Sequence, residues 1–168
     1  MRRLAVIASL VVALAFVAHA AAATTLLRLD GIGPLKLGMS QSAALNTGWL
    51  AHRGKGCAEG GPVPVTYQFR GPRAPGGLSG AAEFTQGRLL IVSVGRGVRT
   101  PQGVTIGSSA AQAVKRYRAA GFSALTQFSP DVAATFLTVN RGRKTVLMGT
   151  VAKRRITSLS VPFVAACD

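Results

Sequence analysis

The fold is decided by LKLGMSQSAAL, residues 35–45, because the chain uses this pattern again as VTIGSSAAQAV, residues 104–114. A glycine and a serine occupy equivalent positions in the two copies, namely Gly38 and Gly107, and Ser40 and Ser109. Each copy indicates a short strand, a glycine turn and a serine that caps a helix. The sequence therefore predicts one structural unit used twice.

A helix is expected after each of these serines. The first would run from Gln41 to Ala51, and the second from Ala110 to Ala120, where Gly121 is placed to end it. The second copy has the capping-box form, with Gln112 three residues after Ser109, so we expect the stronger cap there. Its apolar positions recur at the spacing of one buried face, namely Ala110, Ala113, Val114 and Tyr117.

Runs of β-forming residues bounded by glycine and basic turns follow each helix, and they predict antiparallel strands. They cover residues 64–70, 80–86 and 88–95 in the first half, and residues 133–140, 144–151 and 155–162 in the second. Residues 88–94 also align with residues 155–161 at an offset of 67, close to the 69 of the helix motif. Chance similarity in a chain rich in alanine, glycine and valine is the alternative to duplication.

The predicted fold class is therefore α+β. It is a tandem repeat of a helix plus an antiparallel β-meander, with a first repeat over residues 21–99 and a second over residues 100–168. We expect the two sheets to join into one curved sheet.

The first residues have the three parts of a secretory signal peptide. Arg2 and Arg3 precede an apolar run, and Ala18-His19-Ala20 supplies a small-residue cleavage site. We expect cleavage after Ala20, with Ala23 as the alternative, and a secreted mature protein without a transmembrane segment. An uncleaved membrane anchor is the other interpretation, although the run is shorter than the roughly 20 residues that a bilayer requires.

Cys57 and Cys167 are the only cysteines of the 168 residues. Outside the cytoplasm such a pair predicts a disulfide, which would join the first half to the C-terminus. His52 lies close to Cys57 and Glu59, but we assign no thiol or metal site there, since the disulfide accounts for Cys57 and the segment is a glycine-rich loop. The sequence thus predicts no catalytic residue, no metal and no cofactor.

Charge is the strongest functional signal in the composition. The chain has 20 Lys+Arg and 5 Asp+Glu, and without Arg2 and Arg3 the mature form has 18 against 5, a net charge of +13. Such an excess favours an anionic partner. The candidate contacts are the basic residues of two turns, namely Arg141, Arg143, Lys144, Lys153, Arg154 and Arg155. Charged turns that keep the sheet edges soluble are the alternative interpretation.

The order of short strand, Gly38-Met39-Ser40, helix and meander, used again from Gly107-Ser108-Ser109, resembles a known family. It is similar to the secreted β-lactamase inhibitor proteins and the related outer-membrane assembly lipoproteins of the SmpA/OmlA type. In the inhibitors two such units join their sheets into one curved surface that grips a partner. The resemblance implies that fold and a binding function. This chain differs in having one cysteine pair where each inhibitor unit has its own disulfide, and no lipid-bearing cysteine after the signal.

Together these observations predict a secreted bacterial protein that acts as a non-enzymatic binding module for an acidic protein or an anionic cell-envelope polymer. An envelope structural or assembly accessory protein is the first alternative, and a hydrolase with an unrecognised site is the second. Nucleic acid is not expected as the partner, because the basic turns lack aromatic stacking platforms and an exported protein rarely meets nucleic acid.

Overall fold

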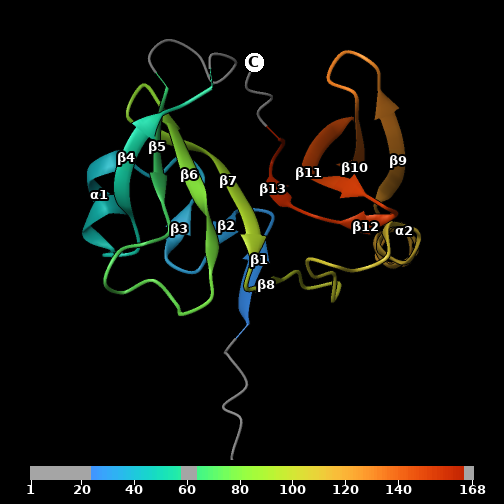
Figure 1. The fold of residues 1–168 in the computed structure, drawn as a ribbon, viewed down its shortest axis with the longest axis horizontal. Coiled ribbons are helices and arrows are strands. Elements are labelled where there is room, and N and C mark those ends of the chain that lie inside the picture. Colours follow the sequence, from blue (N-terminus) through green and yellow to red (C-terminus); the bar gives the residue numbers. More distant parts are fainter. Residues whose placement is uncertain (1–23, 58–63, 165–168) are drawn as a thin grey trace, which may run out of the picture.

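The computed structural model describes residues 24–57 and 64–164, which form a sheet-rich protein with two helices (Figure 1). The elements are β1 (Thr25–Arg28), β2 (Gly31–Ile32), β3 (Leu35–Lys36), α1 (Gln41–Asn46), β4 (Ala51–Lys55), β5 (Val65–Gln68), β6 (Ser79–Thr85), β7 (Arg88–Arg96), β8 (Val98–Arg99), α2 (Ala110–Ala119), β9 (Ser123–Ser129), β10 (Ala134–Arg141), β11 (Lys144–Ala152), β12 (Arg155–Ile156) and β13 (Leu159–Val161). The predicted signal peptide, its cleavage site at Ala20, and Cys167 lie outside the described residues.

Most strands belong to one antiparallel sheet of nine strands. Its order is β4-β5-β6-β7-β13-β11-β10-β9, and β12 pairs with β11 beside this path. The pairing of β7 with β13 lies in the middle, so the strands of the two halves extend to either side of it (Figure 1). A smaller, mixed sheet has the order β3-β2-β1-β8, in which β1 and β8 are parallel.

The strand order of the large sheet is symmetric about its middle. The path β4-β5-β6-β7 of the first half corresponds to β9-β10-β11-β13 of the second. At the junction Ser93 pairs with Ser160, and their hydroxyl oxygens lie 2.8 Å apart. On either side, Val92 pairs with Val161 and Val94 with Leu159. At the offset of 67, Val92 aligns with Leu159 and Val94 aligns with Val161, so each valine pairs with the residue that aligns with the other one. A two-fold axis between Ser93 and Ser160 gives this pattern.

The repeated glycine makes the same contacts in both halves. The Gly38 N–H donates to the Leu89 carbonyl at 2.7 Å, and the Gly38 carbonyl accepts from Arg88 Nη1 at 3.1 Å. The partners of the second glycine are found at the aligned positions. The Gly107 N–H donates to the Ile156 carbonyl at 2.8 Å, and its carbonyl accepts from Arg155 Nη1 at 2.8 Å. The φ angles of Gly38 and Gly107 are 81° and 86°, which a residue with a Cβ rarely adopts.

The second helix agrees with its prediction to within one residue, but the first helix is shorter than predicted and the capping-box prediction is wrong. The first helix ends at Asn46 and not at Ala51, because Gly48 adopts a φ of 74° and the chain turns away. The hydroxyl of Ser40 accepts from the Ala43 N–H at 3.3 Å, whereas Ser109 makes no side-chain cap. With so little helix, the term α+β describes this sheet-rich protein only loosely.

Of the short strands predicted before the helices, the first occurs as β3, whereas residues 104–106 form no strand. Five of the six predicted meander strands occur as β5, β6, β7, β10 and β11, while the sixth is divided into β12 and β13. The division follows from Thr157 and Ser158, whose hydroxyl groups turn back to Thr150 at 2.7 Å. Two strands of the large sheet, β4 and β9, were not predicted, and neither were the two-residue strands β2 and β8 of the small sheet. Strands β4 and β9 form the two outer edges of the large sheet.

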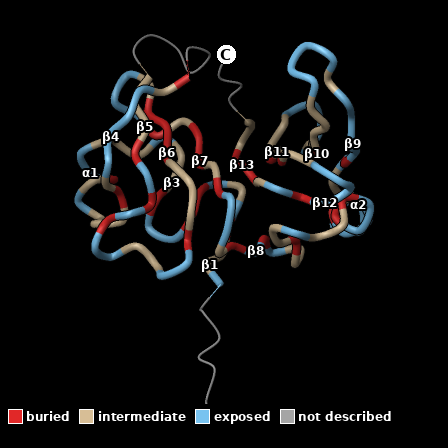
Figure 2. The backbone as a smooth tube through the Cα atoms, in the orientation of Figure 1, coloured by how far each residue is buried: buried red, intermediate tan, exposed pale blue. Residues whose placement is uncertain are grey.

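One contiguous apolar cluster contains residues of both halves. Buried positions follow β5, β6 and β7 and continue into β13 (Figure 2). Tyr117 and Phe84 are the largest fully buried side chains, and each meets a second ring edge-on, at 5.9 Å for Phe122 and 5.8 Å for Tyr67. Within the described ranges, neither helix is long and apolar enough to cross a membrane.

Candidate functional site

One row of paired residues crosses the large sheet from edge to edge. In spatial order it contains Ala51, Gln68, Ala81, Ser93, Ser160, Met148, Thr138 and Leu125. The sequence neighbours of these residues belong to the core, for example Val92 and Val94 beside Ser93, and Leu137 and Val139 beside Thr138. Because side chains alternate along a strand, the row lies on the sheet face turned away from the core. We call this the outer face.

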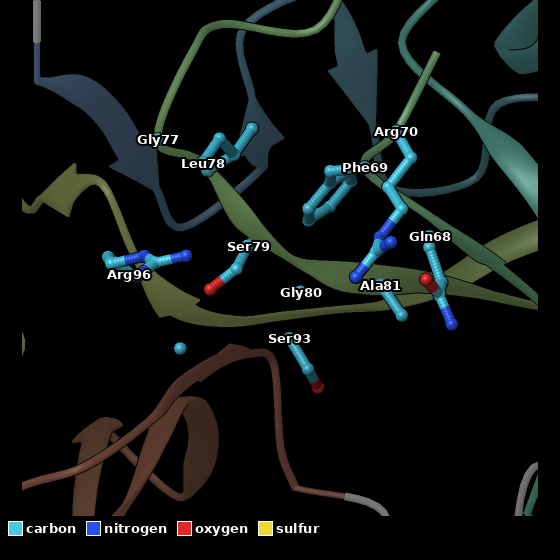
Figure 3. Close-up of a pocket in the computed structure, with 11 residues that line it drawn as sticks. Gln68, Phe69, Arg70, Gly77, Leu78, Ser79, Gly80, Ala81, Ser93 and Arg96 are labelled. Atoms are coloured by element: carbon cyan, nitrogen blue, oxygen red, sulfur yellow. The ribbon is translucent and has the colours of Figure 1, made fainter.

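A hollow of about 700 Å³ lies over the first half of the outer face (Figure 3). Its polar lining consists of Gln68, Arg70, Ser79, Ser93 and Arg96. Arg70 follows β5, Ser79 begins β6, and Arg96 ends β7. We call this hollow the arginine pocket.

Glycines keep the arginine pocket open. Gly80 has a φ of 145°, and a Cβ there would lie 2.1 Å from the Ser93 carbonyl oxygen, so only glycine allows β6 to approach β7 this closely. Gly95 is different, because its Cβ would meet only Ser79 Oγ at 3.6 Å. A side chain at position 95 would therefore project into free space and fill part of the pocket.

The two arginines enter the pocket from opposite sides of the view in Figure 3, with Ser79 and Gly80 between them. Both side chains are exposed, and neither makes a hydrogen bond or an ion pair to another described side chain. The one ion pair found in the described part of the chain joins Lys36 and Asp30 at 3.0 Å. The guanidinium groups of Arg70 and Arg96 are thus available to an external acceptor.

The pocket combines two guanidinium groups with two serine hydroxyls and one amide, and all five can donate hydrogen bonds. Arginine offers a planar fork of donors that fits carboxylate, phosphate or sulfate oxygens. No described carboxylate lines the hollow to compete with such a ligand. The arrangement is suited to holding an anionic group.

The basic residues predicted from the sequence do not meet at one site. Arg141, Arg143 and Lys144 lie at the β10–β11 hairpin, and Lys153 and Arg154 form the turn between β11 and β12. The nine residues of β11 separate these groups by about 27 Å. All of them are exposed, as is Arg155.

Two of these arginines have contacts within the fold. Arg141 lies over the Phe122 ring, 5.1 Å from its centre, in a cation–π contact. Arg155 donates to Gly107 just as Arg88 donates to Gly38, so its side chain belongs to the repeated scaffold contact. The sequence did not single out Arg70 and Arg96. The available signal was their position beside the glycine-rich segments 71–77 and 95–97.

The outer face of the second half has a hollow without basic residues. This hollow, of about 520 Å³, is lined by the apolar side chains Phe128, Val132, Phe136 and Met148 and also by polar residues, namely Gln127, Ser129, Thr138 and Asp131. The three exposed large apolar side chains among the described residues, Leu125, Phe128 and Val132, lie on β9 and in the turn that follows it. This half offers a surface suited to apolar groups of a protein.

The cysteine and histidine positions add no chemistry to this site. Cys57 is buried, and its N–H donates to Glu83 Oε2 at 3.2 Å. Cys167 lies outside the described residues, so the disulfide stays a prediction. His52 is exposed on β4, and no group of metal-ligating side chains occurs in residues 24–57 and 64–164.

A scan against protein-family models and searches of curated proteins and of solved structures gave no significant match. The resemblance to the β-lactamase inhibitor and SmpA/OmlA families therefore stays a prediction, and the function is argued from the geometry of the outer face.

Proposed function

We propose that this chain is a secreted, non-enzymatic binding module whose outer sheet face holds an acidic partner. The arginine pocket receives an anionic group of that partner. The observation that carries the proposal is that Arg70 and Arg96, which pair with no other described side chain, both line one hollow. The high positive charge of the chain supports it by raising the local concentration of anionic partners.

The composition of the outer face favours an acidic protein over an anionic polymer. A polymer would need a continuous track of charge, whereas here Ser160 separates Ser93 of the charged pocket from Met148, which lies in a hollow without basic residues. Protein interfaces combine apolar centres with arginine contacts in this way.

We extend the proposal to the architecture. The two halves are copies of one unit, joined through β7 and β13, and the paired glycine contacts support this relation. The joined sheet is also what the resemblance to the inhibitor family implies. In this interpretation the contacts that both halves share stabilise the fold, and the outer-face residues that differ between the halves determine which partner binds.

The test is retention of envelope and culture components on immobilised protein comprising residues 21–168. The double variant Arg70→Gln/Arg96→Gln is compared with Arg28→Gln/Arg99→Gln, which removes the same charge from exposed positions of the small sheet. The control should keep the partner, and the pocket variant should lose at least about tenfold in affinity, since hydrogen bonds to charged groups are strong.

Salt and protease treatment complete the experiment. Retention by the wild-type chain should fall at high salt. Protease treatment of the extract should abolish retention if the partner is a protein and preserve it if the partner is a polymer. Equal retention by the two double variants would refute the proposed pocket.

A further inference from the structure

The strand β9 leaves an uncharged edge at the end of the large sheet. Its sequence, SALTQFS, pairs with β10 over seven residues without a register shift and pairs with no other described strand. Most of β9 is exposed (Figure 2), including Leu125 at 38% and Phe128 at 59%. Arg118 Nε donates to the Ala124 carbonyl at 2.9 Å, so only the start of this edge is covered by a side chain. Long edges without charge readily accept another strand.

The opposite edge of the same sheet is protected. Strand β4 is interrupted between Ala51 and Arg53, where His52 has a φ of 53°. It also exposes Arg53 and Lys55. Bulges and charges of this kind block edge-to-edge pairing. The two edges occupy equivalent places in the sheet, and only β9 lacks these devices.

We infer that β9 binds an extended acidic segment of a partner protein, which adds to the sheet as a further strand. Basic groups lie at the start of β9 and beside its middle residue, Thr126, while the far end, after Ser129, has one carboxylate at Asp131. Arg141 follows Asn140, which pairs with Ser123 at the start of the strand. Farther along, Thr126 shares a hollow of about 500 Å³ with Lys153 and Arg154. These basic charges complement carboxylates on an added strand.

The same charges argue against a second copy of this chain as the occupant. Two β9 edges brought together would place the basic groups of one molecule against those of the other. With 20 Lys+Arg against 5 Asp+Glu, the chain has few carboxylates to offset that repulsion. An acidic segment would not be repelled in this way.

The faces of β9 define the rest of the segment. Leu125 and Gln127 lie on the outer face, in register with Thr138 and Phe136. Side chains of the added strand that point to this face would lie beside Leu125 and Gln127, and Gln127 lines the hollow of the second half together with Phe136 and Met148. The segment therefore has alternating apolar residues and carries acidic residues that can reach the basic groups.

The inference is tested with synthetic peptides, whose binding is followed by fluorescence anisotropy. The parent peptide alternates valine and threonine over the length of β9 and carries two glutamates at each end. Two isomers are N-methylated at alternate central residues, one along each edge of the peptide, and a fourth peptide has lysines in place of the glutamates. Amide hydrogen exchange of the protein locates the binding site.

We expect the parent peptide to bind and one N-methylated isomer to bind at least about tenfold more weakly, because strand addition depends on main-chain hydrogen bonds along a single edge. The other isomer should bind like the parent. The lysine peptide should also bind at least about tenfold more weakly than the parent, because its charges repel the basic protein. Exchange should slow in residues 123–129 and stay unchanged in residues 51–55. The Arg70→Gln/Arg96→Gln variant should still bind, which separates this inference from the pocket proposal.

Several results would overturn it. They are no binding by the parent peptide, equal binding by the two N-methylated isomers, or protection of β4 in place of β9. A dimer that forms through β9 without peptide, detected by sedimentation, would assign the edge to a second copy and would likewise reject the acidic segment.

Discussion

The two halves of the large sheet share their internal contacts and differ in what they present to solvent. Gly38 with Leu89, and Gly107 with Ile156, make matching hydrogen bonds at 2.7 and 2.8 Å. On the outer face the first half has the arginine pocket, while the second half has a hollow with aromatic and aliphatic side chains and one carboxylate, Asp131. The comparison separates residues that fold the protein from residues that are free to specify a partner.

The largest effects are expected where the halves match in the core. Leu89 and Ile156 are 2% and 1% exposed and occupy aligned positions. Truncating either to alanine removes buried methyl groups and leaves a cavity, so Leu89→Ala and Ile156→Ala should each cost about 3 kcal/mol. Urea denaturation monitored by circular dichroism measures both values.

Because one apolar cluster contains both residues, each variant should unfold in a single transition. Two separate unfolding transitions, or a loss of stability in only one of the two variants, would contradict the equivalence of the halves.

Each half has one buried tyrosine, and only Tyr117 of the second half is expected to make the free energy of unfolding depend on pH. Burial raises the pKa of Tyr117 to about 12 from the model-compound value of 10.0. Between these values the unfolded chain ionises while the folded chain keeps its proton, so stability falls as the pH rises from 10 and levels off above 12. The expected loss is about 2 to 3 kcal/mol.

Tyr117→Phe should remove that alkaline loss and change the free energy of unfolding little at pH 7, since the Tyr117 hydroxyl makes no hydrogen bond of regular geometry and the nearby Thr100 side chain offsets only part of the pKa rise. The matched variant is Tyr67→Phe, whose hydroxyl accepts from Gln41 Nε2 at 3.0 Å and which should cost about 1 kcal/mol at pH 7. Denaturation at several pH values checks both. An unchanged alkaline loss in Tyr117→Phe would exclude this tyrosine as its cause.

The outer face of the first half can be altered without touching the scaffold. A valine at position 95 should fill part of the arginine pocket and weaken partner binding by about tenfold, or roughly 1.4 kcal/mol. Its Cβ meets no atom closer than 3.6 Å, so the free energy of unfolding should not fall. The affinity of Gly95→Val is compared with that of Gly76→Ala, which lies outside the pocket lining. Undiminished binding by Gly95→Val would show that the partner does not enter the pocket.

The parts of the fold that could be predicted are those with a local signal. The glycine turns, the second helix and the inner strands follow from turn residues, periodicity and β-forming runs. Residues 88–94 align in sequence with residues 155–161, and the strands that contain them pair at Ser93 and Ser160. The edge strands gave no such signal. The AHRGK sequence of β4 is charged and contains glycine, and the SALTQFS sequence of β9 barely alternates, so their strand form depends on pairing with a neighbour.

The candidate site was harder to predict than the fold. Arg143 and Lys153 stood out because basic residues cluster around them along the chain, yet β11 separates them. Arg70 and Arg96 are brought to one pocket by the register of β5, β6 and β7, which includes a shift between Ser79 and Gly80. Registers and bulges depend on packing across the sheet, so spacing in the sequence could not reveal this pair.

The smallest expected effect is at the helix caps, where the sequence and the structure disagree. The capping-box pattern predicts that Ser109 contributes more than Ser40. In the structure Ser40 accepts from Ala43 and Ser109 caps nothing with its side chain. Ser40→Ala should therefore cost about 0.5 to 1 kcal/mol, and Ser109→Ala only a few tenths. Urea denaturation of both variants at pH 7 shows whether the sequence pattern or the hydrogen bonds of the structure predict the more important cap. A larger cost at Ser109 would mean that its hydroxyl caps α2 in solution, and the two helices would then begin alike.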